Sequence, residues 1–146
     1  MTRINTVKPS ELLDKHLQAE LKELTRIPNG VVNGKLKLTG SYPDSYRLGA
    51  GHVKFYIPRL GYLYKRYQEL RAEWVNRGFE AWTDYWPDHV PTRLMNDWTP
   101  TVDDVILNVH RLIQQTPKNP RYYRGHVESD YYNKLLQQYQ GLNHEI

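Results

Sequence analysis

Apolar residues recur every three or four positions over residues 9–26, and this spacing predicts an amphipathic helix. Pro9 suits its first turn. The apolar stripe consists of Leu12, Leu13, Leu17, Leu21 and Leu24. His16 and Glu20 lie within the stripe, and for His16 we expect a hydrogen-bonded side chain at the edge of the core. Glu23 falls at the seam between the stripe and a basic edge, where a carboxylate can reach a cleft and keep contact with water. The basic edge consists of Lys15, Lys22 and Arg26.

A second helix is predicted over residues 58–77, where apolar positions again step by three and four. Gly78 is a fitting residue to end it. Four cations lie off this stripe and favour a solvated face: Lys65, Arg66, Arg71 and Arg77. A third helix should open at Thr99-Pro100 and end at Pro117, and a short final helix is expected at residues 130–140.

Turn-forming residues dominate residues 27–51, and an irregular, aromatic-rich connection covers residues 79–98. Loops of this length are typically functional or mobile. The sequence therefore predicts an all-α fold. We expect a single compact domain over residues 1–146, with three main helices, long loops and a short C-terminal helix.

The composition favours an acidic partner, because the formal net charge is +4 and the sequence pI is about 9.2. The chain has 12 Tyr and 4 Trp but only 2 Phe, and Tyr and Trp rings can stack on exposed bases. Zero Cys excludes disulfides, thiolate nucleophiles and Cys-ligated zinc. Because no apolar run approaches ~18 residues and no signal peptide follows Met1, we expect an intracellular, cytoplasmic protein without membrane contact.

Standard enzyme signatures are missing, including a phosphate-binding glycine loop and a metalloprotease motif. Two groups of acids could be imagined as metal ligands: Asp103-Asp104, and Asp84 with Asp88 and His89. Capping acids at a helix start and acids in a loop explain them better.

The N-terminus offers a different chemistry. Met1 before a small residue such as Thr2 is normally removed, which would leave an α-amine on Thr2. An α-amine has a pKa of about 7.7–8.0, so part of it is unprotonated and nucleophilic at neutral pH. Most such termini are idle, so the significance of Thr2 depends on its neighbours. Arg3, and a helix that carries Glu23 between cations, suggest chemistry on a carbonyl-like carbon within a polyanion.

Order, spacing and unusual residue choices agree with a known family over two blocks. The first contains Met1-Thr2-Arg3-Ile4-Asn5, Ser10-Glu11-Leu12, Asp14, His16-Leu17, Ala19-Glu20, Glu23-Leu24 and Arg26. The second contains Leu48-Gly49-Ala50-Gly51-His52-Val53, Arg66, Glu69-Leu70, Glu73 and Arg77-Gly78-Phe79. A weaker third contains Gln115, Pro117 and Arg121-Tyr122-Tyr123. Through these blocks, most of residues 1–125 resemble the phage pyrimidine-dimer DNA glycosylase/AP lyase family, which includes the ultraviolet-repair endonuclease V of T-even phages.

The resemblance implies that the α-amine of Thr2 is the nucleophile and that Glu23 is the catalytic carboxylate. It places DNA-contacting cations at Arg3 and Arg26, and a third at Lys22, where lysine keeps the charge but loses the bidentate fork of arginine. The other DNA-binding candidates are Lys15, His16, His52, Arg121, Tyr122 and Tyr123.

The implied reaction begins with attack of the Thr2 amine on C1′ of the damaged nucleotide, which releases the base and leaves an imine. Removal of the C2′ proton and β-elimination then break the strand on the 3′ side. No cofactor or metal is required. The implied partner is damaged double-stranded DNA, kinked and with one base extruded. We expect a monomer that needs no protein partner.

Several regions depart from the family pattern. Asn119-Pro120 stands where the family has a tryptophan-tyrosine pair, the loops at 27–47 and 79–98 diverge, and residues 126–146 extend beyond the resemblance. Two alternatives stay open, and the divergent loops bear on the first because such loops would set lesion preference. One is a glycosylase/lyase of the same fold for another damaged or modified base, and the other is a catalytically silent DNA-binding module.

Overall fold

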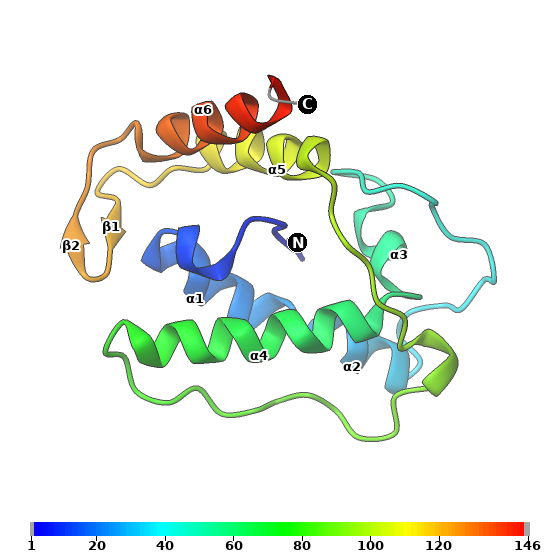
Figure 1. Cartoon of the computed structure of the whole chain (residues 1–146). Helices are drawn as coiled ribbons and strands as arrows, with labels where there is room; N and C mark the ends of the chain where they lie inside the picture. Colours follow the sequence, from blue (N-terminus) through cyan, green and yellow to red (C-terminus); the bar gives the residue numbers. More distant parts are fainter. Residues whose placement is uncertain (1, 145–146) are drawn as a thin grey trace.

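The computed structural model of the chain describes residues 2–144, so Met1, whose removal the sequence predicts, lies outside the described residues. Over this range the chain is mostly helical. The elements in chain order are η1 (Pro9–Glu11), α1 (Asp14–Glu23), α2 (Arg26–Val32), α3 (His52–Tyr56), α4 (Leu60–Asn76), η2 (Thr92–Leu94), α5 (Val102–Gln114), β1 (Arg121–Tyr122), β2 (Gly125–His126) and α6 (Tyr131–His144). In Figure 1 the N-terminal segment runs between α5 and α4, and α6 packs along α5. The all-α prediction is broadly confirmed, with a small hairpin added.

The single helix predicted over residues 9–26 is wrong in extent. The 3₁₀ turn η1 is followed by two residues in extended conformation, Leu12 and Leu13, both fully buried. The N–H of Leu13 donates to the hydroxyl of Tyr132 (2.9 Å), which replaces the carbonyl that a continuous helix would have supplied. α1 therefore begins only at Asp14. The chain re-enters a helix at Arg26, so α2 occupies the start of the region predicted to be a loop.

The apolar stripes of α1 and α4 face one continuous core, as their periodicity predicts. The solvated face predicted for the cations of α4 is wrong for two of them, because Arg66 and Arg77 are each only 4% exposed. Arg77 pairs through Nη1 with Asp14 Oδ1 and through Nε with Glu73 Oε2, both at 2.8 Å. Burial of a guanidinium is tolerated here because its charge is paired and hydrogen-bonded.

α5 begins later than Thr99-Pro100 predicts. Thr101 is its N-cap: the Thr101 hydroxyl accepts from the N–H of Asp104, and the Asp104 carboxylate accepts from the N–H of Thr101. This confirms the capping role expected for Asp104. α6 begins near the predicted position but continues to His144. Its Tyr132 is fully buried, so residues beyond the family resemblance contribute to the core.

The hairpin of β1 and β2 was not predicted, because two-residue strands are too short to show an alternating pattern. Its turn places Tyr123 and Arg124 at positive φ, 52° and 70°. The irregular connection predicted over residues 79–98 is confirmed, and it includes the short 3₁₀ turn η2. Within residues 2–144 no helix is long and apolar enough to cross a membrane.

Candidate active site

The carboxylate of Glu23 lies next to the N-terminal residues. Its Oε1 accepts a hydrogen bond of 3.0 Å from the backbone N–H of Arg3, the residue directly after Thr2. Glu23 is the last residue of α1 and is half-buried, which agrees with its predicted seam position. The contact joins residues 20 positions apart, so the fold brings together the predicted nucleophile and the predicted carboxylate.

Thr2 opens onto a hollow of about 390 Å³. We call it the Thr2 hollow, lined by Thr2, Thr25, Arg26, Ile27, Asn29, Gly30, Asn33, Lys35, Leu36 and Val53. Most of these residues belong to α2 or follow it. A hollow with amide, ammonium and guanidinium groups on its wall suits a polar, anionic ligand.

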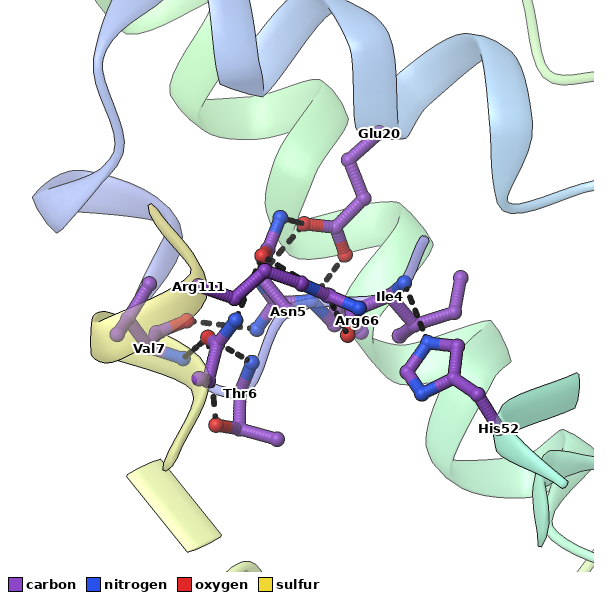
Figure 2. Close-up of polar contacts among 9 residues, drawn as sticks. Ile4, Asn5, Thr6, Val7, Glu20, His52, Arg66 and Arg111 are labelled. Atoms are coloured by element: carbon purple, nitrogen blue, oxygen red, sulfur yellow. Dashed lines mark hydrogen bonds and ion pairs between the residues drawn. The ribbon is translucent and has the colours of Figure 1, made fainter. Parts of the chain in front are cut away.

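The segment that follows Thr2 is held by side chains from four helices, α1, α3, α4 and α5 (Figure 2). The N–H of Ile4 donates to Nε2 of His52 (3.0 Å), and Arg111 Nη2 donates to the Ile4 carbonyl (3.1 Å). Asn108 Oδ1 accepts from the N–H groups of Thr6 (2.7 Å) and Val7 (3.2 Å). These bonds satisfy a backbone that is buried outside any helix or sheet, and they fix the direction in which Thr2 points.

A buried ion pair supports the same segment. The Arg66 guanidinium bonds both oxygens of Glu20, through Nε to Oε2 and through Nη2 to Oε1 (3.0 Å), and its Nη1 donates to the Val7 carbonyl (2.7 Å). Glu20 Oε1 also accepts from Asn5 Nδ2 (2.8 Å). Burial acts to lower the pKa of Arg66, but the adjacent Glu20 outweighs it and raises that pKa above its usual value. The pair is therefore ionised and ties α1, α4 and the N-terminal segment together.

His52 is a positioning residue in this structure. It is only 4% exposed, and both ring nitrogens are engaged: Nε2 accepts from Ile4, and Nδ1 donates to the Arg47 carbonyl (2.9 Å). This pattern assigns the neutral tautomer with its proton on Nδ1. Burial lowers the pKa of His52 to about 4, although the bond to Arg47 opposes this shift. The contacts thus favour a role in holding the N-terminal segment over the DNA contact predicted for His52 from the sequence.

His16 is hydrogen-bonded at the edge of the core, as the apolar stripe predicts. Its Nδ1 lies 2.7 Å from the Tyr132 hydroxyl and its Nε2 lies 3.1 Å from the Gln115 carbonyl. Burial lowers its pKa, with the Gln115 bond opposing, so the ring is neutral at pH 7. His16 shares with Glu23 the lining of a small cavity of about 30 Å³, room for roughly one water molecule.

The predicted DNA-binding cations divide into two groups along α1. Arg3, Lys22 and Arg26 are exposed around the end of α1 that carries Glu23, and Arg26 lines the Thr2 hollow. Lys15 is exposed at the opposite end. Lys15 precedes Glu23 by eight residues, so the two groups lie about 12 Å apart along α1.

The segment Arg121-Tyr122-Tyr123 lies at the same end of α1 as Lys15. The Tyr122 hydroxyl donates to the Ser10 carbonyl (2.7 Å), and the N–H of Tyr123 donates to Asp14 Oδ1 (3.0 Å). Arg77 stacks over both tyrosine rings, at 4.8 and 4.9 Å from their centroids. The structure therefore does not bring this segment to Thr2 and Glu23.

Three residues that hold the N-terminal segment were not predicted from the sequence: Arg66, Asn108 and Arg111. For two of them, Arg66 and Asn108, the sequence contains a feature that could have indicated a buried polar contact. Glu20 in an apolar stripe requires a buried cation, and Asn108 falls between the buried Val105 and Val109 of α5. Arg111 left no such signal.

The comparison with known families agrees with this geometry. The family described as pyrimidine dimer DNA glycosylase matches residues 1–87. The chain belongs to this family, which confirms the predicted resemblance. The matched range contains Thr2, Glu23, His52 and the Glu20–Arg66 pair, and it supports a DNA-repair glycosylase that acts on pyrimidine dimers in DNA. Asn108, Arg111, the hairpin and α6 lie outside it.

Proposed function

We propose that the protein excises ultraviolet-induced pyrimidine dimers from double-stranded DNA and then cleaves the strand at the resulting abasic site. In this proposal Met1 is removed and the α-amine of Thr2 is the nucleophile. The observation that carries it is the 3.0 Å hydrogen bond from Arg3 N–H to Glu23, because it holds a carboxylate beside residue 2. A carboxylate beside an N-terminal amine can transfer the protons that imine formation and elimination involve.

The steps follow from these two groups. The amine of Thr2 forms a bond to C1′ while the bond from C1′ to the base breaks, and the base leaves with its electron pair and takes up a proton. Loss of the amine proton and opening of the sugar ring give an imine. The imine acidifies the C2′ proton, and its removal expels the 3′ phosphate oxygen. Glu23 stabilises the cationic sugar and transfers protons.

Two features of the surroundings favour this chemistry. Arg3 follows Thr2 directly and Arg26 lines the same hollow, and positive charge near an amine favours its unprotonated, reactive form. These cations also attract the phosphates on either side of the lesion. The rigid anchoring of residues 4–7 orients the amine before the substrate binds, which lowers the entropic part of the barrier.

Along α1 the DNA duplex would extend from the Thr2 hollow toward Lys15. The distance of about 12 Å corresponds to roughly three to four base-pair steps. In this proposal the phosphates are contacted by four cations: Arg3, Lys22, Arg26 and Lys15. The part of the duplex farthest from Thr2 is contacted by Arg121, Tyr122 and Tyr123. His16 and His52 act by holding the backbone and the wall of the small cavity.

A borohydride trap tests the mechanism with two duplexes, one carrying a thymine dimer and one an abasic site. Both should yield a covalent complex, and peptide mapping should place the DNA on Thr2. Trapping on the abasic duplex alone would indicate a different lesion, and a complex that maps to a lysine would contradict the Thr2 mechanism. A protein that traps neither duplex would be the silent DNA-binding module.

The variant Glu23→Gln tests the carboxylate. It should fold and bind lesion DNA but lose roughly 10²–10⁴-fold in glycosylase rate. The matched control is Glu128→Gln, an exposed position before α6, which should keep the parent rate. Near-parent turnover of Glu23→Gln would remove Glu23 from the reaction.

A further inference from the structure

A larger hollow, of about 570 Å³, lies at the end of α1 opposite Glu23. We call it the Trp74 pocket. The residues of its lining that matter here come from α1, from the end of α4 and the residues just after it, and from the hairpin: Asp14, Lys15, Trp74, Phe79, Arg121 and Arg124. The pocket lies outside the Thr2 hollow, and the proposed chemistry leaves it unused.

One wall of the pocket is a rigid aromatic surface. Trp74 and Phe79 stack with their ring centroids 4.1 Å apart and an interplanar angle of 19°. Trp82 packs edge-on against Trp74 at 5.6 Å and 83°, which fixes the pair from one side. Trp74 and Phe79 remain half-exposed. A flat, partly exposed ring pair of this kind offers a stacking platform for a planar ligand such as a nucleobase.

The rim of the pocket is cationic. Lys15, Arg121 and Arg124 are all exposed, and the guanidinium of Arg124 lies 5.6 Å from the Phe79 ring centroid. The Arg124 backbone is fixed at φ 70° by its N–H, which donates to Asp14 Oδ2 (2.7 Å). Arg121 Nη1 donates to the Arg124 carbonyl (3.2 Å). The two arginines are thus held beside the aromatic pair.

Asp14, the acidic residue among those that line the pocket, does not cancel this charge. Its Oδ1 bonds Arg77 Nη1 (2.8 Å) and accepts from the N–H of Tyr123 (3.0 Å). Asp14 is one acidic group against three exposed cations, so the rim keeps an excess of positive charge. An anionic ligand is therefore favoured.

We infer that the Trp74 pocket binds one unpaired nucleotide of DNA, with the base stacked on Trp74 and Phe79 and the phosphate held by Lys15, Arg121 and Arg124. A simple anion would not need the ring pair, and an apolar ligand would not need the cations. Lys15 precedes Glu23 by eight residues, or about 12 Å along α1, which is roughly three to four steps of a DNA strand. This nucleotide is therefore not the one attacked by Thr2. The inference rests on the proposed function only for its choice of DNA as the ligand.

A thymidine trimer with a 5′ phosphate and no lesion tests the pocket through tryptophan fluorescence. The trimer should quench the emission saturably, because a base stacks on Trp74. Trp74→Leu and Arg124→Gln should each weaken binding roughly tenfold, while Trp74→Phe should restore the affinity but lose most of the quenching. A trimer of abasic sugar phosphates should bind roughly tenfold more weakly than the thymidine trimer.

The control Lys134→Gln removes one exposed positive charge on α6, away from the pocket, and should bind the trimer like the parent. Thermal melting checks that Trp74→Leu is folded. If Trp74→Leu does not fold, Arg124→Gln still tests the pocket, because Arg124 is exposed. Parent-like binding by both pocket variants, or equal binding of the abasic trimer, would overturn the inference. Glu23→Gln should bind the trimer normally, so a failed borohydride trap and a failed trimer titration are separate results.

Discussion

The backbone N–H of Ile4 donates a 3.0 Å hydrogen bond to Nε2 of His52, so a histidine 48 residues further along the chain fixes the N-terminal segment that carries residue 2. The bond requires a neutral ring, because a protonated imidazole has no acceptor nitrogen. His52 thereby couples the placement of the N-terminus to pH. The same ring also closes the 47–52 turn through its bond to the Arg47 carbonyl.

Because of His52, the free energy of unfolding should decrease as the pH is lowered. The pKa of His52 is about 4 in the folded chain against 6.5 when unfolded, so the unfolded chain takes up the proton first. The contribution of neutral His52 to the free energy of unfolding is complete above pH 6.5 and is lost as the pH falls toward 4. It amounts to ~3 kcal/mol at most. Urea unfolding of the parent protein from pH 7 to 4 measures it.

His52→Gln should be less stable than the parent at pH 7 and should lose less stability between pH 6.5 and 4. Part of the pH dependence should remain, because burial also lowers the pKa of His16. His110→Gln, at an exposed position of α5, is the matched control and should leave the curve unchanged. If His52→Gln follows the parent curve, His52 does not set the pH dependence.

Loss of the Arg66 guanidinium should strongly destabilise the fold. Arg66→Met leaves Glu20, which is 1% exposed, as a buried carboxylate without its cation, and the free energy of unfolding should drop by roughly 3–5 kcal/mol. Denaturant titration measures this. The double variant Glu20→Gln, Arg66→Met should recover part of the loss.

The neighbouring Lys65 provides the control, because it pairs with Asp97 at 2.6 Å on the surface, with 63% of its side chain exposed. Lys65→Met should cost less than about 1 kcal/mol. Equal effects of Arg66→Met and Lys65→Met would show that the Glu20–Arg66 pair does not support the N-terminal segment.

The hydroxyl of Tyr132 should matter although it comes from the C-terminal helix. Tyr132→Phe removes the acceptor of the Leu13 N–H and a partner of His16 Nδ1, and should lower the free energy of unfolding by roughly 1–3 kcal/mol. Tyr85→Phe, at a residue that is 60% exposed, should change it by less than about 0.5 kcal/mol. A Tyr132→Phe protein as stable as Tyr85→Phe would mean that the start of α1 does not depend on this contact.

Arg26 should contribute to DNA binding through a phosphate. Arg26→Gln should weaken binding of lesion duplex and reduce the slope of log affinity against log salt by roughly one unit. Filter binding at several salt concentrations measures both, with Lys134→Gln as the charge-matched control. An unchanged slope would shift the search for the DNA-binding face toward Lys15 and the hairpin.

The sequence predicted most helices because their apolar residues recur at helical spacing. The family resemblance put Thr2 and Glu23 in one site, and the structure places Glu23 against Arg3, the residue after Thr2. The break at Leu12 and Leu13 could not be predicted, since both leucines fit the helical pattern. What overrides it is a hydrogen bond that the Leu13 N–H donates to the hydroxyl of Tyr132, 119 residues away. The burial of Arg66 was missed for a similar reason: its position off the stripe looks solvated until Glu20 and Val7 are placed beside it. Contacts between distant segments decide these cases, and local periodicity carries no information about them.

The anchoring of residues 4–7 by Asn108 and Arg111 has a consequence for synthesis. The start of the chain receives its final position only when α5 has left the ribosome, roughly 100 residues later, which corresponds to about 5–20 s of translation. Until then the terminus is open to the aminopeptidase that would remove Met1, and it lacks the orientation that a nucleophile needs. Under the proposed mechanism, an incomplete chain would therefore carry an amine that is not yet oriented, and strand cleavage would begin only in finished molecules.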